Sequence, residues 1–203
     1  MNTVCFTGPR AKKLVGFSSH KNYMQVVNAV TMLCDDLYKF GIRRFISGGA
    51  QGFDQLAFWG VNNFKKTHPD VKNIVYVPFE GQDRLWMSTG IFSRKEYNQM
   101  IEHADEVKII NKFDETKVGK LLNERNIAMV NDSDAVIALF NIKDLETATH
   151  SGTANCIRYA DSKNKPVVYI EYDVFKNIVR VNDFVTPEDK YDVFSIAKDG
   201  KNI

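Results

Sequence analysis

The sequence predicts an α/β fold built on a mostly parallel sheet of about six strands, with helices on both faces. Two patterns predict it. Short runs of β-branched and aromatic residues recur along the chain, and between them lie longer segments whose apolar residues recur at steps of three and four. Strands that alternate with helices in this way are typical of a parallel sheet, because each connection has to cross one of its faces.

Six segments are predicted as strands and five as helices. The strands are expected at residues 3–8, 43–47, 73–79, 106–110, 134–140 and 166–171. The helices are expected at residues 20–40, 53–64, 93–104, 117–130 and 152–163. Gly41 is a stop signal after the first helix, and Ser93-Arg-Lys-Glu96 is a capping box that opens the third.

Three helices have an apolar stripe that predicts which face is buried. In the first the stripe is Met24, Val27, Val30, Cys34 and Leu37. In the second it is Phe53, Leu56, Ala57, Gly60, Val61 and Phe64. In the third it is Tyr97, Met100, Ile101 and Ala104.

The chain is predicted to form one domain over residues 1–171, which suits its length of 203 residues. A C-terminal extension over residues 172–203 is expected to pack on that domain or to trail from it. Within the extension, VNDFVTPEDKY (residues 181–191) is predicted as a loop.

Composition and charge limit the classes of function. The net charge is only +2, with Lys and Arg spread along the chain, which argues weakly against a dedicated nucleic-acid binder. The three cysteines (Cys5, Cys34 and Cys156) form no CxxC pair or zinc-ligand cluster, so no metal site is predicted and a reduced, cytoplasmic compartment fits best. No apolar run approaches the roughly 18 residues of a membrane span, and no membrane partner is expected.

Three strand-to-helix junctions carry glycine with hydroxyl or basic residues. They are Thr7-Gly8-Pro9-Arg10, Gly48-Gly49-Ala50-Gln51-Gly52 and His150-Ser151-Gly152-Thr153. Parallel sheets bind ligands at the carboxyl ends of their strands, where helix N-termini suit phosphate. Each loop alone reads equally well as an ordinary turn, but three together predict a phosphate-binding edge. Neither a GxGxxG fingerprint nor a GK[ST] sequence is present, so a dehydrogenase or P-loop ATPase is not predicted.

Charged residues near these junctions each allow two interpretations. Asp54 lies in the first turn of a helix, where a carboxylate is favourable in itself, or it accepts a ribose hydroxyl. Arg10 is predicted to bind phosphate. Arg125 falls on an inward stripe, so it either pairs internally, with Asp132 or Asp134, or lines a ligand cavity. The ligand interpretation is favoured.

A third set follows the predicted strand at residues 73–79. Glu80 is the best-placed candidate general acid or nucleophile, and Gln82 follows it. Trp86 either stacks on a base or belongs to the core, and the core is at least as well supported.

The order of six motifs points to a known family. The motifs, which run through residues 3–170, are CFTGPR, FISGGAQGFDQLA, VPFEGQDRLW, ERNIAMVNDSDAVIAL, SGTANCIRYA and KPVVYI. Together they resemble the SLOG superfamily, and within it the YpsA-like branch that is common in Gram-positive bacteria and phages. The superfamily includes the DNA-processing protein DprA and the LOG phosphoribohydrolases. The resemblance implies a Rossmann-like three-layer sandwich with a pocket for nucleotides or nucleotide-derived ligands.

The sequence departs from the LOG enzymes at their catalytic positions. Arg125-Asn126 keeps the arginine of their Arg-Lys pair but not the lysine, and Cys156 stands where their PGGxGTxxE loop has its glutamate. Many relatives have Gly-His-Arg where this chain has Gly8-Pro9-Arg10, so a histidine role is absent. A thiol cannot supply the charge of a carboxylate, which disfavours LOG-type N-glycosidic hydrolysis. Enzymatic activity stays open, with the balance against it.

The leading hypothesis is therefore a protein that binds a nucleotide or ADP-ribose-like ligand for sensing or sequestration, with no cofactor. Its expected binding residues are Thr7, Gly8, Arg10, Gly48, Gly49, Ala50, Gly52, Asp54, Gln82, Arg125, Asn126, Ser151, Gly152 and Thr153. One alternative is a nucleotide N-glycosidase with Glu80 as the catalytic residue. A second is single-stranded DNA binding as in DprA, although nucleic acid is not the expected partner. The protein is also expected to form a homodimer and to act in the cytoplasm of a bacterium or phage-infected cell.

Overall fold

The computed structural model describes residues 1–14, 20–87, 90–141, 144–173 and 178–185. Its centre is one seven-stranded sheet with the strand order β4-β3-β2-β1-β5-β6-β7. The strands are β1 (Thr3–Thr7), β2 (Arg44–Ser47), β3 (Lys72–Phe79), β4 (Glu106–Asn111), β5 (Ala135–Leu139), β6 (Val167–Asp173) and β7 (Ile178–Val185). The first six are mutually parallel, and β7 pairs antiparallel with β6. The α/β fold and all six predicted strands are confirmed.

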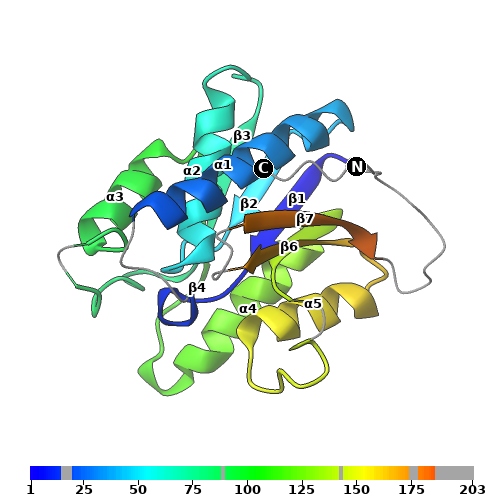
Figure 1. Ribbon diagram of the computed structural model, residues 1–203. Helices are drawn as coiled ribbons and strands as arrows, with labels where there is room; N and C mark the ends of the chain where they lie inside the picture. Colours follow the sequence, from blue (N-terminus) through cyan, green and yellow to red (C-terminus); the bar gives the residue numbers. More distant parts are fainter. Residues whose placement is uncertain (15–19, 88–89, 142–143, 174–177, 186–203) are drawn as a thin grey trace.

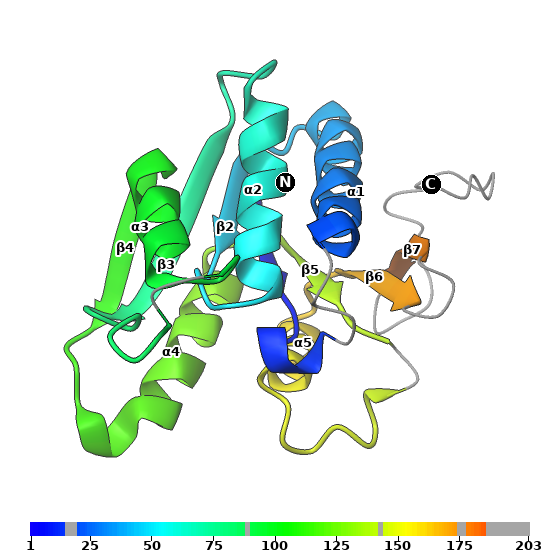
Figure 2. The same ribbon diagram turned by 60° about the vertical axis from the view of Figure 1, so that its left-hand side comes forward.

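Helices cover both faces of this sheet and make three layers (Figure 1, Figure 2). The helices are α1 (His20–Lys39), α2 (Phe53–Lys65), α3 (Arg94–His103), α4 (Val118–Asn131) and α5 (Gly152–Ser162). Helices α1, α2 and α3 lie on one face, and α4 and α5 lie on the other. Two single 3-10 turns, at Ala11–Lys13 and Glu115–Lys117, stand in the loops before α1 and α4.

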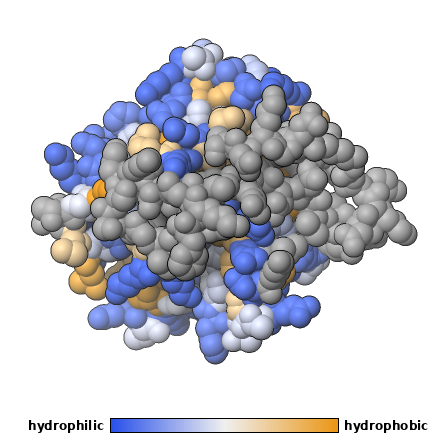
Figure 3. Space-filling model, viewed as in Figure 1, coloured by the Kyte–Doolittle hydropathy of each residue, from blue (hydrophilic) through white to orange (hydrophobic). Residues whose placement is uncertain are grey.

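The core consists of the apolar side chains between these layers. One cluster joins α1 and α2 to β1, β2 and β5, and another joins α4 and α5 to the opposite face of the sheet. Gly60 of α2 lets the helix approach α1, because a Cβ there would lie 2.6 Å from Val30 Cγ1. On the face drawn in Figure 3, most of the coloured surface is hydrophilic and hydrophobic residues form small groups. No helix of the described segments is long and apolar enough to cross a bilayer.

The predicted helix ends and stripes hold with one exception. Gly41 follows α1 with φ +90°, and the Ser93 side chain accepts a hydrogen bond from the backbone N–H of Glu96 at 3.3 Å. The exception is Met24, which is 36% exposed, while Tyr23 beside it is buried. The buried stripe of α1 passes through Tyr23 because that ring packs edge-to-face against Phe92.

The prediction of a loop over residues 181–191 is wrong for its first part. Residues 181–185 belong to β7, which pairs with β6 from Val167↔Val185 to Asp173↔Ile178. Backbone pairing with the buried strand β6 decides the structure here, and the local sequence pattern does not reveal that pairing. Residues 186–191 lie outside the described residues, and the division at residue 171 stays a prediction.

The chain changes direction in the middle of the sheet. It builds outward from β1 through β2 and β3 to β4, then returns to place β5 on the other side of β1. The connection that follows β1 therefore runs toward β2 on one side, and the connection that follows β5 runs toward β6 on the other side. This is the topological switch point at which open α/β sheets leave a crevice for ligands.

Candidate functional site

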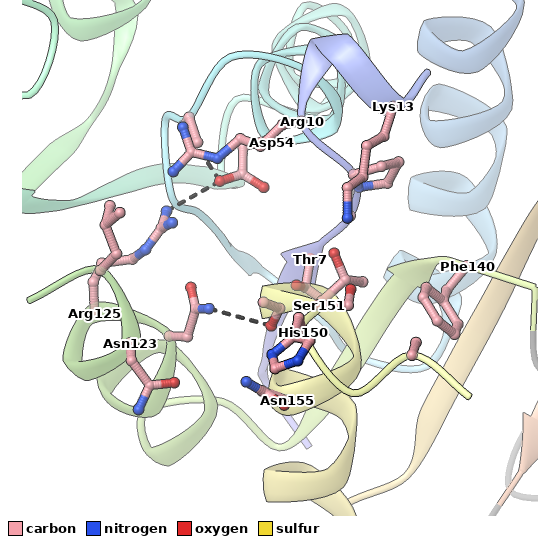
Figure 4. A pocket seen from close by; sticks show the side chains of 18 of the residues that line it. Thr7, Arg10, Lys13, Asp54, Asn123, Arg125, Phe140, His150, Ser151 and Asn155 are labelled. Carbon is pink, nitrogen blue, oxygen red and sulfur yellow. Dashed lines mark hydrogen bonds and ion pairs between the residues drawn. The ribbon is translucent and has the colours of Figure 1, made fainter. Parts of the chain in front are cut away.

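A cavity of about 550 Å³ opens at this switch point. Its walls come from the loops after β1 and β2, from α4, and from the start of α5 (Figure 4). It is lined by Thr7, Gly8, Pro9, Arg10, Lys13, Ala50, Gln51, Asp54, Gly119, Leu122, Asn123, Arg125, Asn126, Phe140, Asp144, Ala148, His150, Ser151, Gly152, Thr153 and Asn155. Ten of the residues predicted for the site are among them, so the three glycine junctions meet at one edge as the sequence suggested.

Arg125 and Asp54 form a buried ion pair at one end of this cavity. Arg125 Nη1 lies 3.0 Å from Asp54 Oδ2, and the two side chains are 5% and 9% exposed. The backbone N–H of Ala50 also donates to Asp54 Oδ2, at 3.3 Å. Each charge stabilises the other in a place where an isolated one would be costly.

The internal partner proposed for Arg125 on sequence grounds was wrong. Asp132 instead accepts hydrogen bonds from Tyr76 and Lys108, and Asp134 accepts from the backbone N–H groups of Asn2 and Thr3. Arg125 does both things that the sequence offered as alternatives, since it is paired internally and also lines the cavity. Its Nε is buried and has no hydrogen-bond partner among the described residues.

Of the glycines after β2, Gly48 makes room for this ion pair and Gly52 makes room for the loop after β1. A Cβ on Gly48 would lie 1.2 Å from Arg125 Nη1, so only glycine leaves room for the guanidinium. Gly52 has φ +112°, and a Cβ there would lie 2.5 Å from the carbonyl oxygen of Pro9. Gly48, Gly49 and Gly52 do not line the cavity, whereas Ala50 and Gln51 between them do.

Packing also requires a glycine at residue 8, in the first junction. A Cβ on Gly8 would lie 2.4 Å from Cδ1 of Phe53, the first residue of α2. The loop after β1 and the loop after β2 therefore touch, and an isolated bridge between Arg10 and Gly52 ties them together. This contact holds Arg10 and Asp54 at the same end of the cavity.

Two further cations face the cavity from the loop after β1. Arg10 lies beside Asp54, and Lys13 projects from the 3-10 turn that follows (Figure 4). Loss of surrounding water lowers the pKa of Arg10, the Asp54 carboxylate opposes this shift, and Arg125 adds to it. Arg10 is exposed and remains protonated under such a shift, so its guanidinium is available to an anionic ligand.

The start of α5 forms the opposite wall. Ser151 is the N-cap, and its hydroxyl accepts from the backbone N–H of Ala154 at 3.3 Å. Asn126 Nδ2 of α4 donates to the carbonyl oxygen of Gly152 at 3.5 Å, which holds the two helices together. The first N–H groups of a helix and its dipole favour an anion at this place.

Cys156 lies one turn into α5, does not line the cavity, and is 2% exposed. Burial raises the pKa of its thiol to about 11, although Thr7 and Arg125 oppose the shift. A thiol with this pKa is protonated at neutral pH and is a poor nucleophile. Its position fits a packing role.

Glu80 and Gln82 lie apart from the first cavity. Glu80 is exposed and lines neither this cavity nor its neighbour. Gln82 lines the neighbour, a space of about 420 Å³ bordered by Arg10, Phe79, Gly81, Gln82, Arg84, Leu85, Trp86, Phe113, Glu115, Val118 and Leu122. Arg10 and Leu122 border both cavities.

Sequence reasoning missed several lining residues. Lys13, Asn123 and Asn155 carry polar groups, and of these Lys13 had a signal, since it follows Arg10 in the run GPRAKK. No signal in the sequence indicated that Phe79 and Phe113 border a cavity. They come together only because β3 pairs with β4, where Phe79 stands opposite Asn111.

The motifs of the sequence can be compared with a family model. A family model described as the YspA SLOG family (YpsA) matches residues 4–175. The chain belongs to this family. The family resemblance drawn from the motifs is therefore confirmed.

Two curated relatives of this chain come from bacilli. The SPbeta prophage-derived protein YoqJ of Bacillus subtilis is 36% identical over 126 residues, which cover 58% of this chain and 68% of YoqJ. UPF0398 protein BH1768 of Halalkalibacterium halodurans is 29% identical over 142 residues, which cover 70% of this chain and 73% of the relative. Both relatives are bacterial, and YoqJ is described as prophage-derived.

Solved structures of DprA share the fold. DprA from Streptococcus pneumoniae superposes with a TM-score of 0.57 at 15% identity, covering 87% of this chain and 52% of that one. DprA from Helicobacter pylori, described for its single-stranded DNA binding mode, gives a TM-score of 0.51 at 18% identity, covering 83% and 64%. This chain therefore spans between half and two thirds of those structures, and the likeness is one of fold.

Proposed function

We propose that this member of the YpsA family binds a nucleotide or a nucleotide-derived, ADP-ribose-like ligand, and that it acts in sensing or sequestration in the cytoplasm of a bacterium or phage-infected cell. The observation that carries the proposal is the 550 Å³ cavity at the β1/β5 switch point. Arg10 and Lys13 on one side and the N-terminus of α5 on the other direct positive charge and N–H donors into it. Small-molecule sites commonly measure about 300–1,000 Å³ and combine a few convergent polar groups with apolar walls.

The groups that line the cavity suit different parts of such a ligand. The phosphate is assigned to Arg10, Lys13 and the start of α5, where Ser151 and Thr153 add hydroxyls. Asp54 is assigned to a sugar hydroxyl, because its carboxylate is oriented by Arg125 and faces the same space. In this assignment Arg125 holds Asp54 in place and touches the ligand only at the cavity edge.

The arrangement favours binding over N-glycosidic hydrolysis. Of the carboxylates in the described part of the chain, only Asp54 and Asp144 line the cavity, and Asp54 is engaged with Arg125. The candidate catalytic residue Glu80 lies outside it, and Cys156 is a buried thiol. We therefore expect Glu80→Gln to leave both ligand affinity and any turnover unchanged.

Single-stranded DNA is the second candidate, because the Helicobacter pylori DprA structure is described by its single-stranded DNA binding. Arg10, Lys13 and Arg125 all line one cavity, which favours a compact ligand. A gel-shift series over salt concentration separates the two. Binding driven by many phosphates weakens steeply as salt rises, and no shift at low salt would exclude DNA.

The proposal is tested first by purifying the full chain from its native host, denaturing it, and identifying any released nucleotide by mass spectrometry. Calorimetry with AMP and ADP-ribose then measures affinity. A hydrogen bond to a charged group contributes about 1.5–3 kcal/mol, so Arg10→Ala and Lys13→Ala are each expected to weaken binding about tenfold or more.

Lys12→Ala is the matched control for Lys13→Ala. Both lysines are exposed and belong to the same 3-10 turn, but only Lys13 lines the cavity. We expect the Lys12 variant to bind like the unmodified protein. Equal losses in the two variants would mean that only diffuse surface charge is at work, and the cavity assignment would then fail.

A further inference from the structure

The second cavity, of about 420 Å³, adjoins the first at Arg10 and Leu122. We propose that it is the subsite for the aromatic base of the ligand whose phosphate occupies the first cavity. This inference rests on the proposed function and deepens it, because it fixes the direction in which the ligand lies. The base would point toward the end of β3 and the phosphate toward the start of α5.

The walls of this second cavity are aromatic. The rings of Phe79, at the end of β3, and Phe113, just after β4, have centroids 5.0 Å apart at an interplanar angle of 55°. Trp86 stands edge-on to Tyr97, with centroids 5.1 Å apart. Stacking on aromatic side chains is the usual way in which proteins hold bases, since every base has a π face.

Part of the apolar wall of this cavity is open to solvent. Phe113 is 45% exposed and Leu85 is 97% exposed, although both border the cavity. Contiguous exposed apolar surface next to polar groups is a mark of a ligand-binding groove. A flat ring lying on Phe113 would cover apolar area that the folded chain leaves in water.

Polar groups at the cavity suit a base more than a plain hydrocarbon. Gln82 Nε2 donates to the hydroxyl of Tyr97 at 2.9 Å, so the amide that borders the cavity is held in one orientation. The guanidinium of Arg84 lies over the Phe113 ring at 5.4 Å from its centroid and adds a flat cation at the same wall. Amide and guanidinium groups offer the donors and acceptors that base edges require.

Arg10 joins the two subsites. Because it borders both cavities, its guanidinium lies where the phosphate or sugar of the ligand would meet the base. A sugar phosphate without a base would fill only the first cavity. The aromatic subsite therefore predicts that the protein distinguishes a nucleotide from ribose 5-phosphate.

The experiment compares AMP, ADP-ribose and ribose 5-phosphate as probes, using the full chain and calorimetry. The unmodified protein is expected to bind AMP about fivefold or more tightly than ribose 5-phosphate. Phe113→Ala is expected to weaken AMP binding by about fivefold or more, the loss measured for removing a stacking partner, and to leave ribose 5-phosphate unchanged. Phe113→Leu, which keeps apolar volume without a π face, should weaken AMP binding in the same direction.

Phe40→Ala is the matched control, because Phe40 is 48% exposed and lies between α1 and the start of β2, at the amino ends of the strands. It should bind all three probes normally.

If Phe113→Ala and Phe113→Leu change neither AMP nor ribose 5-phosphate binding, the base subsite is overturned while the proposed function stands. If none of the three probes binds the unmodified protein, the proposed function fails and this inference with it. Tighter binding of a single-stranded oligonucleotide than of AMP, lost in Phe113→Ala, would assign the aromatic wall to DNA instead.

Discussion

The identity of Gly48 is decided by a side chain from a distant part of the sequence. Arg125 Nη1 occupies the space where a Cβ of residue 48 would lie, and Asp54 Oδ2 would be 2.6 Å from the same atom. The ion pair therefore needs a residue without a side chain at this point of the loop. A buried ion pair of this kind stabilises the fold little by itself, but forcing its two side chains apart leaves unpaired charges in the interior.

We predict that Gly48→Ala lowers the free energy of unfolding by about 3–5 kcal/mol, because the new methyl group separates Arg125 from Asp54. Urea denaturation followed by circular dichroism measures the change. Gly119→Ala is the control, since a Cβ there meets nothing within 4 Å. In the first turn of α4 that change should be neutral or stabilising by up to about 1 kcal/mol. Equal stability of the two variants would contradict the account of Gly48.

At the scale of elements, two helices begin with the same cap but serve different purposes. Ser151 caps α5 and Ser93 caps α3, each by accepting a hydrogen bond from a backbone N–H three residues on, at 3.3 Å. The start of α5 lies at the cavity, whereas Ser93 lines neither cavity. The two caps are thus a natural pair for separating stability from binding.

We predict that Ser151→Ala and Ser93→Ala each lower the free energy of unfolding by about 1 kcal/mol, the usual cost of losing an N-cap. Only Ser151→Ala should also weaken AMP binding, by about tenfold, because only its hydroxyl and helix N-terminus face the ligand. Thermal unfolding and calorimetry on the two proteins measure both effects. A loss of affinity in Ser93→Ala as large as that in Ser151→Ala would show that general destabilisation, not contact, is responsible.

For the whole molecule, the antiparallel strand β7 extends the sheet beyond its six parallel strands. It covers the outer edge of β6, whose residues Val167, Val168, Tyr169 and Ile170 are buried. The family model ends at residue 175, before β7 begins. The question is therefore whether β7 contributes to the stability of the whole sheet.

We predict that a chain ending at Asp173 is less stable than one ending at Val185 by about 2 kcal/mol or more, because the edge of β6 loses its backbone partner. For a chain of this size the loss corresponds to about 4–8 °C in Tm. Both chains lack residues 186–203, so the comparison reports on residues 174–185 alone. Equal Tm values would support the predicted division at residue 171 and contradict the role given to β7.

Local patterns in the sequence were sufficient for the order and type of most elements. Apolar periodicity located six strands and five helices, and the Ser93 cap and the Gly41 stop depend only on neighbouring residues. Met24 and residues 181–185 failed because an aromatic contact in one case, and pairing with β6 in the other, outweighed the local pattern. Motif order was enough to identify the family.

The sequence by itself determined the α/β class, the family and the three junctions that meet at one edge of the sheet. Only the tertiary structure decided what the residues at that edge contact. The partner of Arg125, the reason for Gly48 and the aromatic wall of Phe79 and Phe113 all depend on segments far apart in the chain. The apolar periodicity of a segment predicts on which face of its helix or strand a residue lies. A specific contact also requires that face to meet the face of another element, and this depends on strand order and register.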